Sequence, residues 1–245
     1  MQICALKTHK EKQLEYKYKF DKNNCWFKEK CDLFDTENCR EICSRYRNLD
    51  FLANSALLSK NQQHPPKLRC DDDDIGSFER LNEIRKNIYD FVNSGKNLVI
   101  QSEFTGNGKT SWALKLLMQY ISKLGYNEKP RALFINVPKF VMMKKDMISG
   151  YVHPDLRYIL DNIEQVDLVV WDDIAVTEMT PYDYLNIYVH INTRIDNGKS
   201  NIYTSNYVGN KIADVLGDRL YSRVMLTAET LTFYGDDKRN IGGLD

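Results

Sequence analysis

The stretch NLVIQSEFTGNGKTSWAL, residues 97–114, decides the fold. It begins with NLVIQ (97–101), an apolar run typical of a buried strand. It then passes through a glycine-rich turn into an amphipathic pattern that continues to about Lys123. A strand, a glycine-rich loop and the start of a helix, in that order, are the setting of a phosphate-binding loop. The stretch therefore predicts an α/β protein that binds a nucleotide.

Each residue type in this loop suits a triphosphate. Gly106 and Gly108 allow the backbone to turn so that successive N–H groups face the phosphates. Lys109 would reach the β- and γ-phosphates, and the Thr110 hydroxyl would coordinate Mg²⁺. The new helix adds the positive end of its dipole. We therefore expect ATP and Mg²⁺ to be bound by seven consecutive residues: Thr105, Gly106, Asn107, Gly108, Lys109, Thr110 and Ser111.

One position departs from the pattern G-x-x-x-x-G-K-[ST]. The first glycine of that pattern falls at position 103, where this chain has Glu103. A carboxylate near a triphosphate is repulsive unless it points outward. Nucleotide binding without productive hydrolysis is therefore an alternative to a working ATPase.

A second acidic motif, DLVVWDDI (167–174), lies about sixty residues downstream. An NTPase with a phosphate loop needs an acidic group at the end of a neighbouring strand. Asp172 would hold Mg²⁺ through water, and Asp173 would orient or deprotonate the attacking water. An acidic strand end without chemistry is the alternative, but its position downstream of the loop favours the functional interpretation.

The rest of the chain after Phe78 alternates helical and strand patterns. Apolar residues recur at helical spacing at Leu81, Ile84, Ile88, Phe91 and Val92. Thr180 and Pro181 are expected to open a later helix and Asn197–Gly198 to end it. Further strands are expected at 132–137, 167–171, 201–206 and 230–235. Alternating strands and helices predict a parallel sheet with right-handed crossovers.

Composition fits a packed protein. The 245 residues are 42% hydrophobic and include 15 Tyr and 10 Phe, which argues against disorder. No membrane-length apolar run and no signal-peptide pattern is present, so we expect a soluble cytoplasmic protein without a membrane partner. The net charge is zero, but residues 1–70 hold 14 Lys and Arg against 9 Asp and Glu. A basic segment of this kind fits an acidic partner as well as ordinary solvated charge.

The cysteines gather near the N-terminus. All six lie in the first 70 residues, and four have the spacing C-x5-C-x7-C-x3-C: Cys25, Cys31, Cys39 and Cys43. Four thiolates suit tetrahedral Zn²⁺, and a segment this short has too little core to fold alone. An iron–sulfur cluster and free buried thiols are the alternatives.

Composition also divides the chain into three parts. Residues 1–58 form a cysteine-rich module, and residues 77–245 form the nucleotide-binding domain. Residues 59–76 contain Pro-Pro, four consecutive aspartates (Asp71–Asp74) and Gly76, and we interpret them as a solvated linker. Four adjacent carboxylates cannot all converge on one metal ion.

Several motifs in order resemble a known family: TGNGKTSWAL, VDLVVWDDI, GKSNIYTSN, LGDRLYSRV and FYGDDKR. The chain resembles the AAA+ helicase loaders of the DnaC/DnaI type, with the transposition ATPase IstB as a cousin, and it looks most like phage- or prophage-encoded members. The resemblance covers about residues 75–245. It implies an AAA+ P-loop parallel sheet flanked by helices, without a C-terminal helical lid, preceded by a small cysteine-rich module.

The resemblance also implies roles for residues after the fourth strand. Asn206 would be the sensor that contacts the γ-phosphate or the lytic water. Arg223 matches the arginine finger that acts on ATP held by a neighbouring subunit, and Arg219 is a rival or helper. Arg239 matches the second sensor arginine. A surface salt bridge is the alternative for each arginine.

By the same resemblance, the chain would load a hexameric replicative DNA helicase onto single-stranded DNA and would self-associate through its ATPase domain. The N-terminal module would grip the helicase. In residues 136–158, three lysines would contact DNA and an aromatic ring would stack on a base; the candidates are Lys139, Lys144, Lys145, Phe140 and Tyr151. A helix with a core face of Phe140, Val141 and Met143 is the competing interpretation. An IstB-like transposition ATPase and a nucleotide-gated helicase inhibitor are the alternative functions.

Overall fold

The computed structural model describes most of the chain after residue 67 and parts of the cysteine-rich segment. The described residues are 22–25, 28–40, 43, 46, 68–124, 131–175 and 179–238.

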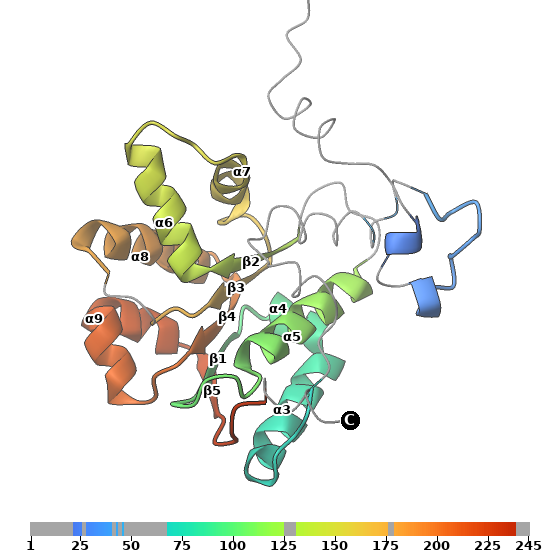
Figure 1. Ribbon diagram of the computed structural model, residues 1–245, viewed down its shortest axis with the longest axis horizontal. Helices are drawn as coiled ribbons and strands as arrows, with labels where there is room; N and C mark the ends of the chain where they lie inside the picture. The colour runs from blue at the N-terminus through green and yellow to red at the C-terminus, as the bar shows by residue number, and fades with distance from the viewer. Residues whose placement is uncertain are drawn as a thin grey trace, which may run out of the picture.

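A five-stranded parallel sheet forms the centre of the fold (Figure 1). The strands are β1 (Asn97–Gln101), β2 (Ala132–Asn136), β3 (Leu168–Asp172), β4 (Ser200–Ser205) and β5 (Ala228–Thr232). Their order across the sheet is β2-β3-β4-β1-β5, and every neighbouring pair is parallel. The predicted α/β class is confirmed, although β5 begins two residues before the expected position.

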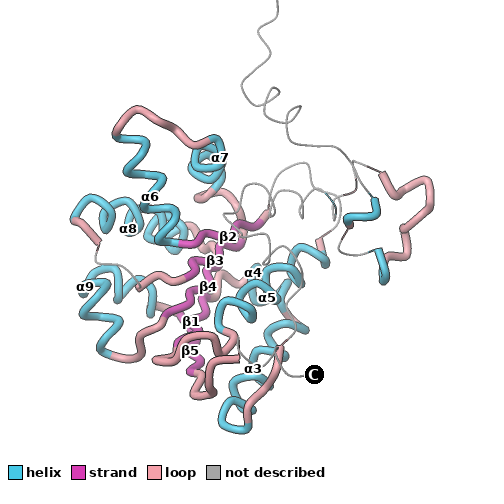
Figure 2. The backbone as a smooth tube through the Cα atoms, viewed as in Figure 1, coloured by secondary structure: helices cyan, strands magenta, loops and turns pink. Residues whose placement is uncertain are grey.

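Helices cover both faces of this sheet (Figure 2). One side carries α3 (Ile75–Lys86), α4 (Ile88–Asn93) and α5 (Lys109–Lys123). The other side carries α6 (Val137–Ile148), α7 (Pro154–Asn162), α8 (Pro181–Asp196) and α9 (Asn210–Met225). Within the described residues, the 3-10 helices before α3 are η1 (Lys22–Asn24), η2 (Lys28–Lys30) and η4 (Asp72–Asp74). None of the helices in these described ranges is long and apolar enough to cross a membrane.

Two hydrophobic cores follow from the alternation of side chains along the strands. In β1, Leu98 and Ile100 pack toward α3, α4 and α5, whereas Val99 packs on the opposite face. Every one of the five residues of β1 and of β3 is buried. Strands buried on both faces read as continuous apolar runs, which is why these strands were visible in the sequence.

Local signals explain where several helices begin and end. Thr180 and Pro181 open α8, as the sequence predicted, and Asp183 completes a reciprocal capping box with Thr180. The helix expected from Phe78 divides at Asn87 into α3 and α4, and its predicted apolar face is buried. In α9, Gly217 has non-helical angles (φ 68°, ψ 155°), which divide the helix into two halves.

Two of the four aspartates, Asp71 and Asp74, contact the domain, which differs from the predicted solvated linker, whereas Asp72 and Asp73 are exposed. Asp74 is fully buried, and its carboxylate accepts backbone hydrogen bonds from Tyr234 (2.7 Å) and Gly235 (3.3 Å). Asp71 pairs with Lys238 at 3.0 Å. The aspartates therefore join the segment before α3 to the segment after β5, an interaction between distant residues that composition does not reveal.

A buried arginine forms hydrogen bonds to several residues at the amino-terminal edge of the sheet. Arg194 of α8 is fully buried. Its guanidinium donates to the carbonyl oxygens of Ile163 (2.6 Å), Val166 (2.9 Å) and Ser200 (2.7 Å), and to Asn201 Oδ1 (2.7 Å). Burial lowers the pKa of Arg194 to about 9, so the side chain is still charged at neutral pH.

Candidate functional site

The candidate site lies at the carboxyl edge of three adjacent strands. β1 runs into the glycine-rich loop, β3 ends at Asp172, and β4 is followed by Asn206. The register pairs Gln101 with Ser205, so the ends of β1 and β4 are level. Ligands of open parallel sheets bind at this edge. The fold thus brings the loop and the acidic motif together, although they are far apart in sequence.

The loop is shaped by its glycines and by a buried serine. Gly106 (φ 74°) and Gly108 (φ 105°) have left-handed backbone angles that favour glycine. The Ser102 hydroxyl oxygen accepts from the N–H of Phe104 (3.0 Å) and from Asn107 Nδ2 (2.6 Å). The loop conformation is therefore built into this chain by contacts within residues 102–108.

Lys109 lies over the loop, as the motif requires. Lys109 is 5% exposed, and its ammonium donates to the Phe104 carbonyl oxygen (2.6 Å) and to Asn107 Oδ1 (3.2 Å). Both acceptors are neutral. Phosphate oxygens are charged acceptors and form stronger hydrogen bonds with an ammonium. The lysine is thus placed to exchange loop contacts for phosphate contacts.

Glu103 points away from the loop interior. Its side chain is 50% exposed and pairs with Lys211 in the first turn of α9. The carboxylate that replaces the expected glycine is thereby partly neutralised and faces solvent. The sequence analysis predicted repulsion between this carboxylate and a triphosphate unless the side chain points outward, and it does point outward.

Asp172 is the most buried carboxylate of the site. One oxygen, Oδ1, accepts from the Thr110 hydroxyl (2.8 Å) and from the Thr204 hydroxyl (2.8 Å). Burial raises the pKa of Asp172 to about 6, and the nearby charge of Asp173 adds to the shift, while hydrogen bonds from Thr204, Thr110 and Asn136 oppose it. A carboxylate kept in apolar surroundings gains from a nearby cation, so the pair Thr110 and Asp172 suits Mg²⁺.

Asp173 follows directly and has an unusual backbone. It has a left-handed φ of 57°, and Asn206 Nδ2 donates to its Oδ1 at 3.3 Å. Burial raises the pKa of Asp173, whereas the charge of Lys109 and the hydrogen bond from Asn206 lower it. The structure thus brings Asp173, Asn206 and the loop lysine into one electrostatic cluster.

Two of the three candidate arginines, Arg219 and Arg223, fall within the described residues, and both belong to α9. Arg223 is near the end of α9 and pairs with Asp196 of α8 at 3.7 Å, and Arg219 is exposed. Arg239 lies outside the described residues. In the part of the chain that the structure describes, neither Arg219 nor Arg223 forms a hydrogen bond or an ion pair with the phosphate loop of its own chain.

The helix after β2 corrects part of the nucleic-acid prediction. Phe140 is fully buried and packs with Val141 and Met143, so the competing core interpretation is the right one for this ring. Lys144 is buried as well, because its side chain lies on the inner face of α6. The exposed candidates are Lys139, Lys145 and Tyr151.

The cysteine motif is only partly described. Each of its four cysteines is half-buried. Within the described residues, no group of three or more His, Cys, Asp or Glu side chains is placed to hold a metal ion. The zinc prediction therefore rests on the chemistry of four thiolates, and the geometry of the described residues adds no support for it.

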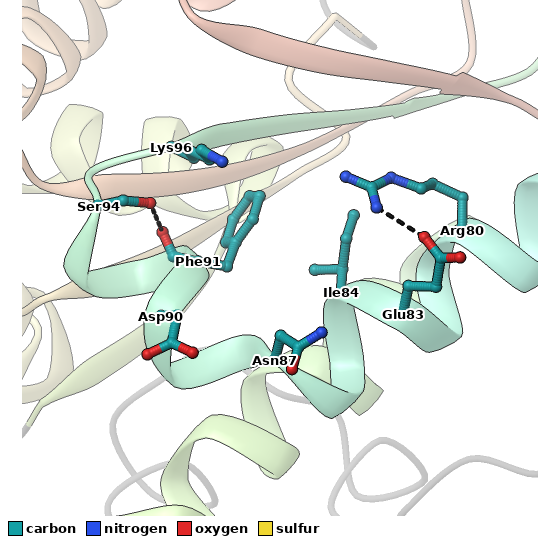
Figure 3. Close-up of a pocket in the computed structure, with 8 residues that line it drawn as sticks. All are labelled: Arg80, Glu83, Ile84, Asn87, Asp90, Phe91, Ser94 and Lys96. Atoms are coloured by element: carbon teal, nitrogen blue, oxygen red, sulfur yellow. Dashed lines mark hydrogen bonds and ion pairs between the residues drawn. The ribbon is translucent and has the colours of Figure 1, made fainter.

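A cavity of about 350 Å³ lies away from the motifs, between α3, α4 and the start of β1 (Figure 3). Its wall includes Arg80, whose guanidinium is already paired with Glu83 and with Glu229 of β5. None of the predicted site residues lines it. The cavity therefore does not bear on nucleotide chemistry.

Sequence reasoning missed three polar residues that shape the site. Thr204 and Asn136 contact Asp172, and Ser102 holds the loop. All three lie at the ends of predicted strands. In a parallel sheet those ends share one edge, so their position was a usable signal.

Comparison with known proteins identifies the architecture. No protein-family model matches the sequence, and no curated protein matches it. Among solved structures, the DnaC helicase loader matches with a TM-score of 0.60 at 18% identity, covering 72% of this chain and 100% of that chain. A DnaI structure matches with a TM-score of 0.56 at 16% identity, covering 74% and 94%.

An initiator has a related domain. DnaA from Aquifex aeolicus, solved with bound AMPPCP, matches with a TM-score of 0.51 at 20% identity. The match covers 67% of this chain but only 48% of that DnaA chain. At these identities the likeness establishes the fold alone, which is AAA+-like.

Proposed function

We propose that this chain is an ATP-dependent loader that delivers a hexameric replicative helicase onto single-stranded DNA. The observation that carries the proposal is the convergence of Lys109, Thr110, Asp172, Asp173 and Asn206 at one edge of an AAA+-like sheet. The match to the DnaC helicase loader, which covers 100% of that solved chain and 72% of this one, supports the loader assignment over other uses of the fold.

The residues fit ATP with Mg²⁺. Loop N–H groups and Lys109 bind the phosphates, and the Thr110 hydroxyl and Asp172 carboxylate are the hard oxygen donors that Mg²⁺ prefers. When bound, Mg²⁺ neutralises charge on the phosphate oxygens. Asp173 orients or deprotonates the attacking water, and Asn206 holds Asp173 and contacts the γ-phosphate. Arg239 is proposed as a further phosphate contact on family resemblance alone.

Removing the loop ammonium should abolish nucleotide binding. We expect Lys109→Ala to weaken ATP affinity at least 100-fold, because a buried charge-assisted contact to phosphate is worth about 3 kcal/mol. Titration calorimetry measures the change. Lys123→Ala, at the exposed far end of the same helix, is the matched control and should bind ATP normally. Equal affinities for the two variants would contradict the assignment of the loop.

The unusual Glu103 should matter little. Because its carboxylate is half-exposed and paired with Lys211, removing its charge changes an interaction of less than about 1 kcal/mol. We expect Glu103→Gln to shift ATP affinity less than fivefold, measured by the same titration. A larger gain in affinity would mean that the carboxylate opposes the triphosphate after all.

Contact with DNA is proposed for the exposed edge around α6. Lys139 and Lys145 carry positive charge there, and Lys145 is also paired with Asp183 at 3.1 Å. Tyr151 is 57% exposed, and its ring centroid lies 4.7 Å from that of His153. Exposed aromatic rings beside lysines suit single strands, because bases stack on the rings and phosphates pair with the ammonium groups. Lys139→Ala with Tyr151→Ala should weaken binding of a fluorescent oligonucleotide. Unchanged binding would move the DNA contact elsewhere.

The N-terminal module is proposed as the helicase contact. We propose that residues 1–58 are separate from the ATPase domain and hold Zn²⁺ through Cys25, Cys31, Cys39 and Cys43, on the donor set alone. Elemental analysis of the purified chain should find about one zinc per chain, lost in Cys39→Ser. Iron in its place would indicate an iron–sulfur cluster, and neither metal would indicate free thiols.

The decisive experiment is co-purification with candidate replicative helicases, followed by mass measurement of the complex and an unwinding assay on circular single-stranded DNA. A loader raises unwinding in the presence of ATP, and Lys109→Ala does not. Reduced unwinding would identify an inhibitor instead. Capture of a transposase and no helicase would select the IstB-like alternative.

A further inference from the structure

Thr204 occupies a position between the two acidic residues of the site. It is the fifth residue of β4 and is fully buried. Its hydroxyl donates to Asp172 Oδ1 (2.8 Å) and accepts from the backbone N–H of Asp173 (2.9 Å). One side chain thus contacts a proposed metal-binding carboxylate and the backbone of a proposed catalytic one.

The Thr204 hydroxyl can donate only one hydrogen bond. A threonine hydroxyl has one O–H to donate and lone pairs to accept. The accepted bond comes from a backbone N–H, so the O–H must point to Asp172. Thr110 donates to the same Asp172 oxygen, but its own oxygen is the one proposed to face Mg²⁺. Thr204 is therefore a donor to Asp172 without a second role toward the nucleotide, as is Asn136, but of these two only Thr204 also contacts Asp173.

The backbone of Thr204 acts on the same turn. Its carbonyl oxygen accepts from the N–H of Ile174 at 3.0 Å. The Thr204 side chain thus accepts from the N–H of Asp173, and its main chain accepts from the N–H of Ile174. These two peptide groups flank the Asp173 Cα. Asp173 has a left-handed backbone (φ 57°), which a non-glycine residue adopts at a cost of about 1 kcal/mol. Two hydrogen bonds from one residue offset that cost and aim the Asp173 carboxylate at Asn206.

We propose that Thr204 is a positioning residue that sets the orientation of Asp172 toward the metal and of Asp173 toward the attacking water. The inference rests on the proposed ATP chemistry of this site. Hydrogen-bond partners behind metal ligands commonly change metal affinity or activity 10- to 100-fold when they are lost.

The test compares Thr204→Val with Thr204→Ser. Valine keeps the shape of threonine and loses the hydroxyl, whereas serine keeps the hydroxyl. Ser200→Ala is the matched control, because it removes a buried hydroxyl from the same strand at the opposite edge of the sheet, where it bonds Lys96. Thermal melts of all variants identify any that lose the fold.

Two quantities are measured: ATP affinity with Mg²⁺ and with EDTA, and kcat against KM for hydrolysis. We expect Thr204→Val to lose most of the Mg²⁺-dependent gain in affinity and to lower kcat 10- to 100-fold, with affinity in EDTA unchanged. Thr204→Ser should restore both, and Ser200→Ala should resemble the wild type.

The outcomes separate the two proposals. If the wild-type chain shows Mg²⁺-dependent ATP binding and Thr204→Val does too, Thr204 is only a core residue and the inference is wrong, while the function stands. Equal loss in EDTA and in Mg²⁺ would also overturn it, because a positioning role toward the metal cannot act without one. If the wild type binds no ATP, the proposed function fails, and this inference fails with it.

Discussion

The Arg223→Ala variant is expected to hydrolyse ATP about 10³-fold more slowly than the wild-type chain and to bind ATP equally well. An arginine supplied by a neighbouring subunit neutralises charge that develops on the transferred phosphoryl group, and such arginines contribute 10³ or more to kcat. Under the proposed intersubunit mechanism, ground-state ATP is bound by the loop of the other subunit, so we expect its affinity to stay unchanged. Phosphate release and titration calorimetry measure the two quantities.

A matched control comes from the same ion pair. Arg223 contacts Asp196 at 3.7 Å, and the Asp196 side chain is 55% exposed. Such a pair is worth less than about 1 kcal/mol, so breaking it should not unfold the chain. Asp196→Asn breaks the pair and keeps the arginine. It should retain wild-type turnover.

Mixing variants tests whether the arginine acts between subunits. Lys109→Ala and Arg223→Ala should each be inactive alone. Mixed together, they should regain part of the activity, because some sites then combine an intact loop with an intact arginine from the neighbour. Loss of turnover in Arg219→Ala with normal turnover in Arg223→Ala would transfer the role to Arg219. Normal turnover in both would remove the intersubunit mechanism.

The second large effect concerns stability. We expect Arg194→Ala to lower the free energy of unfolding by about 3–5 kcal/mol, because it leaves buried carbonyl groups without donors and opens a cavity. Those carbonyls belong to the segment after α7 and to the first residue of β4. Chemical denaturation followed by circular dichroism measures the loss.

Two further variants divide this effect into its causes. Arg194→Met fills most of the volume and removes the donors, so it isolates the hydrogen bonds. Arg157→Ala removes an exposed arginine of α7 and should cost less than about 0.5 kcal/mol. If Arg194→Met were as stable as the wild type, the buried charge would be dispensable, as it is in some proteins in which a buried ion pair was replaced by apolar residues.

The fold was largely predictable because its signals are local. NLVIQ coincides with β1 residue for residue, and the helix from Lys109 to Lys123 has the predicted bounds. Buried parallel strands produce apolar runs, and caps such as Thr180 with Asp183 mark helix starts. The start of β5 was predicted two residues too late, because its residues are only half-buried and carry a weaker pattern.

Site residues could be predicted where they belong to a sequence motif. They could not be predicted where their role depends on contacts between residues that are distant in sequence. The loop and the acidic pair were identified from spacing. Thr204, by contrast, is recognisable only once β3 and β4 are known to be neighbours. Phe140 was left open between DNA stacking and the core, because an aromatic residue near lysines fits both. The burial of Asp74 likewise depends on residues 160 positions away.

The non-helical Gly217 divides α9 into two halves. Lys211, in the first half, is paired with Glu103 of the chain's own loop, whereas Arg223, in the second half, is paired with Asp196 of α8. The segment that contacts the loop and the segment that carries the candidate arginines are therefore not parts of one continuous rod.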